Sequence, residues 1–193
     1  MTEPATTGQG RTEPATTEPA TTEPARTEPA TTEPARTEQA HSPHLLRRTD
    51  IEALPERRHV HQFNPNAVRM TRSISELLGL TRVGVHLIRL EPGRDSTQFH
   101  SHDRDEEFIY VLSGRGVADI GDARHEVGPG DFMAFPERSA PHSLSNPFAE
   151  DLVYLVGGER NPLDVVHYPR IARSMIKSDG RKRWMAWEDI HDV

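Results

Sequence analysis

From residue 83 to residue 156, short runs of β-branched and aliphatic residues alternate with turn-forming Gly, Pro, Asp and Asn. Each run has the ordinary length of a β-strand and is shorter than a typical helix. Turn chemistry marks the intervals, for example at Pro92-Gly93, Gly121-Asp122 and Gly128-Pro129-Gly130. The expected strands are 83–91, 107–112, 116–120, 124–127, 131–135, 142–146 and 151–156. Short strands at this close spacing predict an all-β fold, a small barrel or a sandwich.

Residues 2–40 have a different character, because a five-residue unit, TEPAT or TEPAR, recurs along them. The segment contains no aromatic and no β-branched aliphatic residue, so it cannot bury enough apolar surface to offset the entropy of ordering it. Its seven glutamates and three arginines leave a net charge of −4. We therefore expect 1–40 to be a disordered, semi-extended tail that acts as a solvating spacer, with a docking tether as the alternative.

Averaged over its 193 residues, the chain is 34% hydrophobic with a mean hydropathy of −0.71, which is too polar for one globular unit. The repeat tail accounts for much of this polarity, and the 153 residues that follow it are ample for one domain with a core. We expect an N-terminal flanking segment at 41–82 that packs on the barrel, the barrel itself at 83–157, and an irregular C-terminal arm at 158–193.

The two flanking segments carry weaker signals. Asp50 is expected to cap one helical turn that ends before Pro55, and 73–80 could be a helical turn or a short strand. In the arm, 171–176 is expected to form a brief helix. The pair Trp184 and Trp187, on an edge strand or a packing arm, is expected to cover core residues.

Composition also excludes several classes of function. The absence of cysteine excludes disulfides, thiolate metal sites and cysteine nucleophiles. No apolar run reaches the roughly 18 residues that span a bilayer, and the N-terminus lacks the apolar region of a secretory signal. Mild acidity favours no nucleic-acid partner. By elimination we expect a cytoplasmic protein that binds neither nucleic acid nor membrane.

The stretch from Gly93 to Gly114 holds the most distinctive chemistry. His100 and His102 are two residues apart, and side chains at this spacing on an extended strand project from the same face. If 103–106 is a hairpin turn, Glu107 folds back beside both imidazoles. Neutral imidazoles with one carboxylate suit a divalent first-row metal ion.

Two further features involve histidine. His142 lies 35 residues after Glu107, and in an antiparallel barrel it can return to the same interior. His59 and His61 repeat the His-x-His spacing, but no carboxylate follows at a matching distance. We interpret this second pair as solvent-exposed or structural rather than as a second metal site.

The combined spacing resembles the cupin superfamily. The first half of the cupin pattern matches Gly93, His100-Ser101-His102, Glu107 and Gly114, with a spacer of six residues before His100 where five is usual. The second half matches Gly130, Pro136, His142 and Asn146, except that Arg138 replaces a glycine and the loop is one residue longer. The resemblance covers about residues 83–157.

This resemblance implies a double-stranded β-helix, a jelly-roll-like barrel, with a metal site formed by His100, His102, Glu107 and His142. Glu106 is the alternative carboxylate, because a spacing of three residues is also allowed in the family. The resemblance further implies pairing into a homodimer.

The expected function is metal-dependent action on a small organic molecule, with an oxygenase favoured. Fe(II) is the favoured ion, and Mn, Ni or Zn are alternatives. The oxygenase hypothesis depends on an apolar pocket lined by Ile109, Val111 and Leu144. A non-catalytic binding or sensory cupin is one alternative, and no residue beyond the metal ligands is assigned to catalysis. A sugar isomerase or epimerase ranks lower, because no cluster of basic residues is evident inside the predicted barrel.

Overall fold

The computed structural model describes residues 42–191, and the predicted repeat tail lies outside the described residues. The elements in chain order are α1 (Arg48–Ala53), β1 (Arg57–His61), β2 (Asn64–Ser73), the 3-10 helix η1 (Ser75–Leu78), β3 (Val83–Leu90), β4 (Ser101–His102), β5 (Glu107–Ser113), β6 (Gly116–Ile120), β7 (Ala123–Val127), β8 (Phe132–Phe135), β9 (His142–Ser145), β10 (Leu152–Glu159), β11 (Leu163–Tyr168), η2 (Pro169–Ile171), β12 (Arg173–Ser178), β13 (Arg181–Ala186) and η3 (Trp187–Asp189). The fold is mostly β, and each strand expected between residues 83 and 156 is present.

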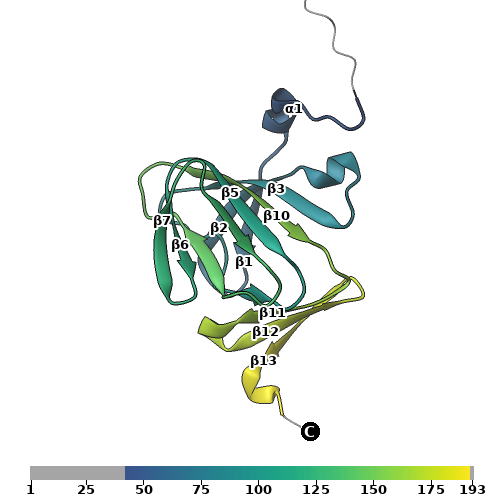
Figure 1. Cartoon of the computed structure of the whole chain (residues 1–193), viewed down its shortest axis with the longest axis vertical. Helices are drawn as coiled ribbons and strands as arrows, with labels where there is room; N and C mark the ends of the chain where they lie inside the picture. Colours follow the sequence, from purple (N-terminus) through teal and green to yellow (C-terminus); the bar gives the residue numbers. More distant parts are fainter. Residues whose placement is uncertain (1–41, 192–193) are drawn as a thin grey trace, which may run out of the picture. The chain divides into compact units, whose positions relative to one another are not determined.

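The strands form three antiparallel sheets (Figure 1). Their orders are β1-β2-β3-β10-β5-β8, β13-β12-β11-β4 and β7-β6-β9. Sequence neighbours pair where a two-residue turn joins them, as at Gly121-Asp122 between β6 and β7. Distant strands pair elsewhere, and β10 lies between β3 and β5 along almost its whole length.

One apolar core fills the barrel. Its members come from strands on both sides of the fold: Ile88, Leu90, Ile109, Val111, Ala118, Val127, Met133, Phe135, Leu144, Leu152 and Tyr154. A second, smaller cluster of Val166, Tyr168 and Met175 lies on β11 and β12, with Trp184 packed against it. Trp184 therefore covers apolar residues as expected. Trp187 is more exposed, and its indole Nε1 donates to Ser174 Oγ at 2.9 Å.

The C-terminal arm is more regular than the sequence suggested. Residues 171–176, expected to be a brief helix, lie mainly in strand β12, so that prediction was wrong. The arm adds a three-strand antiparallel ladder, which joins the barrel through the pairing of Val166 with His102. Pairing with β11 and β13 outweighs a weak local preference for helix, since strand propensity depends strongly on context.

The N-terminal flanking segment also contributes two strands, β1 and β2, to the six-stranded sheet. Asp50 lies inside α1 and not at its cap, where its carboxylate accepts the backbone N–H of Arg47 at 2.8 Å. Residues 73–80 contain the 3-10 helix η1, so of the two alternatives, a helical turn or a short strand, the structure has the helical turn. None of the helices within 42–191 has the length and apolar character that a bilayer crossing demands.

In the loop that departs from the cupin spacing, the residue at the position of the expected glycine has a left-handed backbone conformation. Arg138 has φ of 58°, in the left-handed region that normally favours glycine. Its N–H donates to the carbonyl of His102 at 2.8 Å, so the loop is anchored beside one of the predicted metal ligands. The arginine thus occupies the turn at a conformational cost of about 1–2 kcal/mol.

Candidate metal centre

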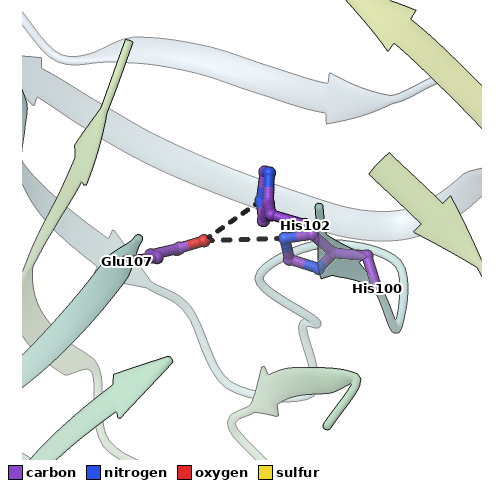
Figure 2. A group of neighbouring side chains, drawn as sticks. All are labelled: His100, His102 and Glu107. Carbon is purple, nitrogen blue, oxygen red and sulfur yellow. Dashed lines mark ion pairs between the residues drawn. The ribbon is translucent and has the colours of Figure 1, made fainter. Parts of the chain in front are cut away.

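The structure brings the four predicted ligands together at one point inside the barrel. Figure 2 shows the side chains of His100, His102 and Glu107 converging from strand β5 and from the segment around β4. Their ligand atoms lie within 4.8 Å of one another, and this group could hold a metal ion. Glu107 Oε2 lies 3.6 Å from His100 Nε2 and 3.5 Å from His102 Nε2.

His142 joins this group from β9. Its Nε2 lies 3.6 Å from Glu107 Oε2, and backbone hydrogen bonds in both directions tie it to His100 across an isolated bridge. The ring stacks on Phe135, with centroids 3.5 Å apart, and is almost fully buried. Both of its ring nitrogens lack a hydrogen-bond partner. Because an unpaired buried nitrogen costs free energy, its Nε2 beside Glu107 fits a metal ligand better than a structural histidine.

The route by which Glu107 reaches the histidines differs from the prediction. Residues 103–106 were expected to form a hairpin turn, but β4 pairs with β11 whereas β5 pairs with β10 and β8. The segment therefore crosses from one sheet to another. Glu106, the alternative carboxylate, is exposed and lines a different surface cavity, as the alternation of side chains requires.

Hydrogen bonds fix the tautomers of two ligands. His100 Nδ1 lies 3.0 Å from the carbonyl of Gln98, and His102 Nδ1 lies 2.7 Å from the Asp164 carboxylate. Both partners only accept, so Nδ1 carries the proton in each neutral ring. The lone pairs of both Nε2 atoms are then available for a metal ion, which is the arrangement that ligating histidines need.

Electrostatics couples these groups. Burial would raise the pKa of Glu107, but the three imidazoles beside it outweigh burial and hold the pKa well below its ordinary value. Burial lowers the pKa of His100. For His102 burial acts in the same direction, but the hydrogen bonds to Asp164 and Glu107 prevail and raise its pKa to about 9. A metal ion held by this group would therefore displace a proton from His102.

Asp164 is a residue of the candidate site that sequence reasoning missed. It is fully buried on β11, on the same face as Val166 and Tyr168. Its Oδ2 accepts from His102, and its Oδ1 accepts the backbone N–H groups of Arg104 at 3.0 Å and Asp105 at 3.4 Å. These bonds outweigh its burial and lower its pKa to about 2. The sequence pattern that could have revealed it is the two-residue spacing of Asp164, Val166 and Tyr168, which places the carboxylate on the buried face of the strand.

A cavity of about 400 Å³ opens beside the four ligands. Ile109 and Leu144 line it as expected, but Val111 is fully buried in the core and does not. The cavity is also more polar than expected, because the flanking segments add basic and hydrogen-bonding side chains: His59, His61, Gln62, Arg69 and Lys182. The prediction that no basic cluster lies inside the barrel was made for 83–157, and the Arg and Lys side chains of this cavity come from other parts of the chain. Those residues lie outside 83–157, where the sequence indicated only flanking structure.

An aromatic contact brings the two flanking segments together over this cavity. Phe63, in the β1–β2 turn, lies edge-on to Trp184 of β13 with centroids 4.8 Å apart. His61 packs against Tyr168 and Trp184, and Tyr168 stacks on His100. His61 is thus a cavity residue in contact with the site. Within 42–191 the possible metal groups are His100, His102 and Glu107, and His102, Asp105 and Asp164, so neither includes His59 or His61.

Comparison with known proteins agrees with this architecture. The family model described as Cupin domain matches residues 86–158. A crystal structure of a candidate sugar phosphate isomerase from Acidithiobacillus ferrooxidans is 38% identical, with a TM-score of 0.76, over 78% of this chain and 97% of that one. The chain belongs to the cupin superfamily. The likeness to that structure extends beyond the matched segment of this cupin and into its flanking strands.

Two further relatives add detail. A cupin-superfamily sugar phosphate isomerase from Silicibacter pomeroyi is 25% identical with a TM-score of 0.64, over 70% of this chain and 88% of that one. An uncharacterized protein of Methanocaldococcus jannaschii is 34% identical over 55 residues, which span 28% of this cupin and 43% of that protein. The match thus covers less than half the length of this curated relative.

Proposed function

We propose that this cupin is a metal-dependent isomerase that interconverts the aldose and ketose forms of a small sugar. The observation that carries the proposal is that hydrogen-bonding residues, among them Gln62 and Thr97, line the cavity beside the histidine and glutamate cluster. A hydroxylated substrate needs such partners, since each buried hydroxyl must be hydrogen-bonded. The names of the two sugar phosphate isomerase structures support the same class.

The donor set fits a metal ion. Three imidazoles and one carboxylate suit Fe(II), Mn(II), Ni(II) or Zn(II), and the unpartnered nitrogens of His142 fit the same assignment. A divalent ion held by His100, His102, Glu107 and His142 would supply Lewis-acid polarisation of a substrate carbonyl. The protein itself holds the tautomers of His100 and His102.

His61 is suited to orient the substrate. The backbone N–H of Phe63 donates to His61 Nδ1 at 3.2 Å, so the proton of the neutral ring is on Nε2. Burial, followed by the charges of neighbouring groups, lowers the pKa of His61 to about 4, and the ring is neutral at pH 7. Its Nε2–H can therefore donate a hydrogen bond to a carbonyl or hydroxyl oxygen of the sugar.

An oxygenase is the second candidate. Apolar residues also line the cavity, among them Ile109, Leu144 and Val156, and would suit a less polar substrate beside Fe(II). A binding or sensory cupin would use the same site without turnover.

One experiment separates these functions. The protein is purified anaerobically, and its metal content is compared with that of His102→Ala and Glu107→Ala by elemental analysis. Aldose substrates are then added to the wild-type protein in D₂O. An isomerase that transfers the proton through exchangeable groups incorporates deuterium into the ketose without oxygen, which ¹H NMR detects. Oxygen consumption in an electrode would favour the oxygenase. Ligand-induced thermal stabilisation without any turnover of sugars would favour the binding protein and contradict the proposal.

A further inference from the structure

The charges around the cavity are unbalanced. Glu107 is the one acidic side chain among the described residues that line it, whereas Arg69 and Lys182 contribute two positive charges. A divalent ion in the cluster would add two more. A cleft with a net positive charge and apolar walls concentrates anions.

Arg69, on β2, has a guanidinium N–H group without a hydrogen-bond partner. Its Nη1 donates to the carbonyl of Ser96 at 3.2 Å, while its Nε is buried without a hydrogen-bond partner. No carboxylate among residues 42–191 forms an ion pair with it, although Arg72 and Arg89 nearby in the sheet both pair with Glu56. Because no carboxylate neutralises it, the Arg69 guanidinium keeps its positive charge available to an anion in the cavity.

Lys182 reaches the same cavity from β13. Residues 182 and 184 share one face of this strand, and both line the cavity, whereas Arg181 and Arg183 belong to the opposite face. Lys182 likewise has no ion-pair partner within the described part of the chain. His59 of β1 pairs with Arg69 of β2 in the sheet, and both line the cavity with Lys182. Burial and then the positive charges of Arg69 and Lys182 lower the pKa of His59.

We propose that Arg69, Lys182 and His59 form a subsite for the phosphoryl group of the substrate, on the side of the cavity built by the flanking strands β1, β2 and β13. The inference rests on the proposed isomerase, and it narrows the substrate class to phosphorylated sugars. Guanidinium, ammonium and imidazole N–H groups are the side-chain donors that recognise phosphate oxygens. The hydroxycarbonyl end of the substrate then lies toward the histidine and glutamate cluster.

The test measures the binding of inorganic phosphate to the full metal-loaded chain by isothermal titration calorimetry at low ionic strength. Lys182→Gln and Arg69→Gln are each expected to weaken binding about tenfold or more, as for the loss of one charge-assisted hydrogen bond. Arg183→Gln is the matched control, because it removes the same charge from the opposite face of the same strand, and its affinity should stay within about twofold of wild type. Lys182 is exposed, so its variant is informative even if Arg69→Gln fails to fold.

Equal phosphate affinity in all four proteins would place phosphate on the metal alone and overturn the subsite, as would no binding at all. The proposed function fails separately. If no sugar phosphate is isomerised but Lys182→Gln still weakens phosphate binding, the subsite stands and the isomerase does not. If a sugar is isomerised but Lys182→Gln leaves phosphate binding unchanged, the isomerase stands and the subsite does not.

Discussion

Replacing Asp164 by asparagine should weaken metal binding without dismantling the fold. The two carboxylate oxygens have separate tasks: Oδ1 accepts the backbone N–H groups of Arg104 and Asp105, and Oδ2 accepts from His102 at 2.7 Å. An asparagine keeps Oδ1 and replaces Oδ2 by an NH₂ group. The backbone bonds survive, and the change falls on His102 alone.

The magnitude follows from that single contact. An amide N–H facing Nδ1–H of His102 either leaves two donors opposed or forces the ring proton to Nε2, where it blocks coordination. A charge-assisted hydrogen bond contributes about 1.5–3 kcal/mol, and second-shell changes of this kind typically cost 10–100-fold in metal affinity. We expect Asp164→Asn to raise the metal dissociation constant by a factor in that range.

The assay is a competition titration with a chromophoric chelator at fixed pH. Asp103→Asn is the matched control, since it is the same isosteric exchange on a half-exposed carboxylate that contacts His167 instead of a ligand. Near-ultraviolet circular dichroism of both variants should match wild type. A dissociation constant for Asp164→Asn within about twofold of wild type would refute the idea that this carboxylate holds His102 for the metal.

Three further predictions concern stability and the tail. In the metal-free protein the pKa of His102 is raised from 6.5 to about 9, so its stabilising contribution is fully present below pH 6.5 and is lost as pH rises through 9. Denaturant titrations should show the free energy of unfolding falling across that window, and His102→Gln should flatten the fall; a flat wild-type profile would contradict the coupling. Gly114→Ala should destabilise more than Gly130→Ala, because a Cβ at Gly114 would lie 2.2 Å from the carbonyl oxygen of Asp151, whereas Gly130 has open space and only a left-handed φ, worth about 1–2 kcal/mol. Similar melting temperatures for the two variants would argue against that clash. Deletion of residues 1–40 should leave metal content and folding unchanged, and a loss of metal on elemental analysis would show that the tail belongs to the fold.

Much of the site was predictable because its signals are local. His100 and His102 share a strand face by the two-residue period, and the fixed distances to Glu107 and Gly114 specify where the next strand begins. The all-β fold followed in the same way from short apolar runs and the turn residues between them. Such features depend on a few neighbouring residues and on backbone geometry, so they can be predicted without knowing the order of the strands.

The remainder depends on which distant strands meet. Asp164 lies 62 residues from His102, and the pairing of β11 with β4 brings the two together. Arg69 and Lys182 come from opposite ends of the domain and line one cavity only because the fold brings β2 and β13 to it. Residues 171–176 became a strand for the same reason, since a ladder partner outweighed local preference. The sequence, through its local patterns and its family resemblance, thus predicted the barrel strands and the four candidate ligands. The tertiary structure alone decided what surrounds those ligands, because long-range pairing is set by the packing of the whole domain and not by local spacing.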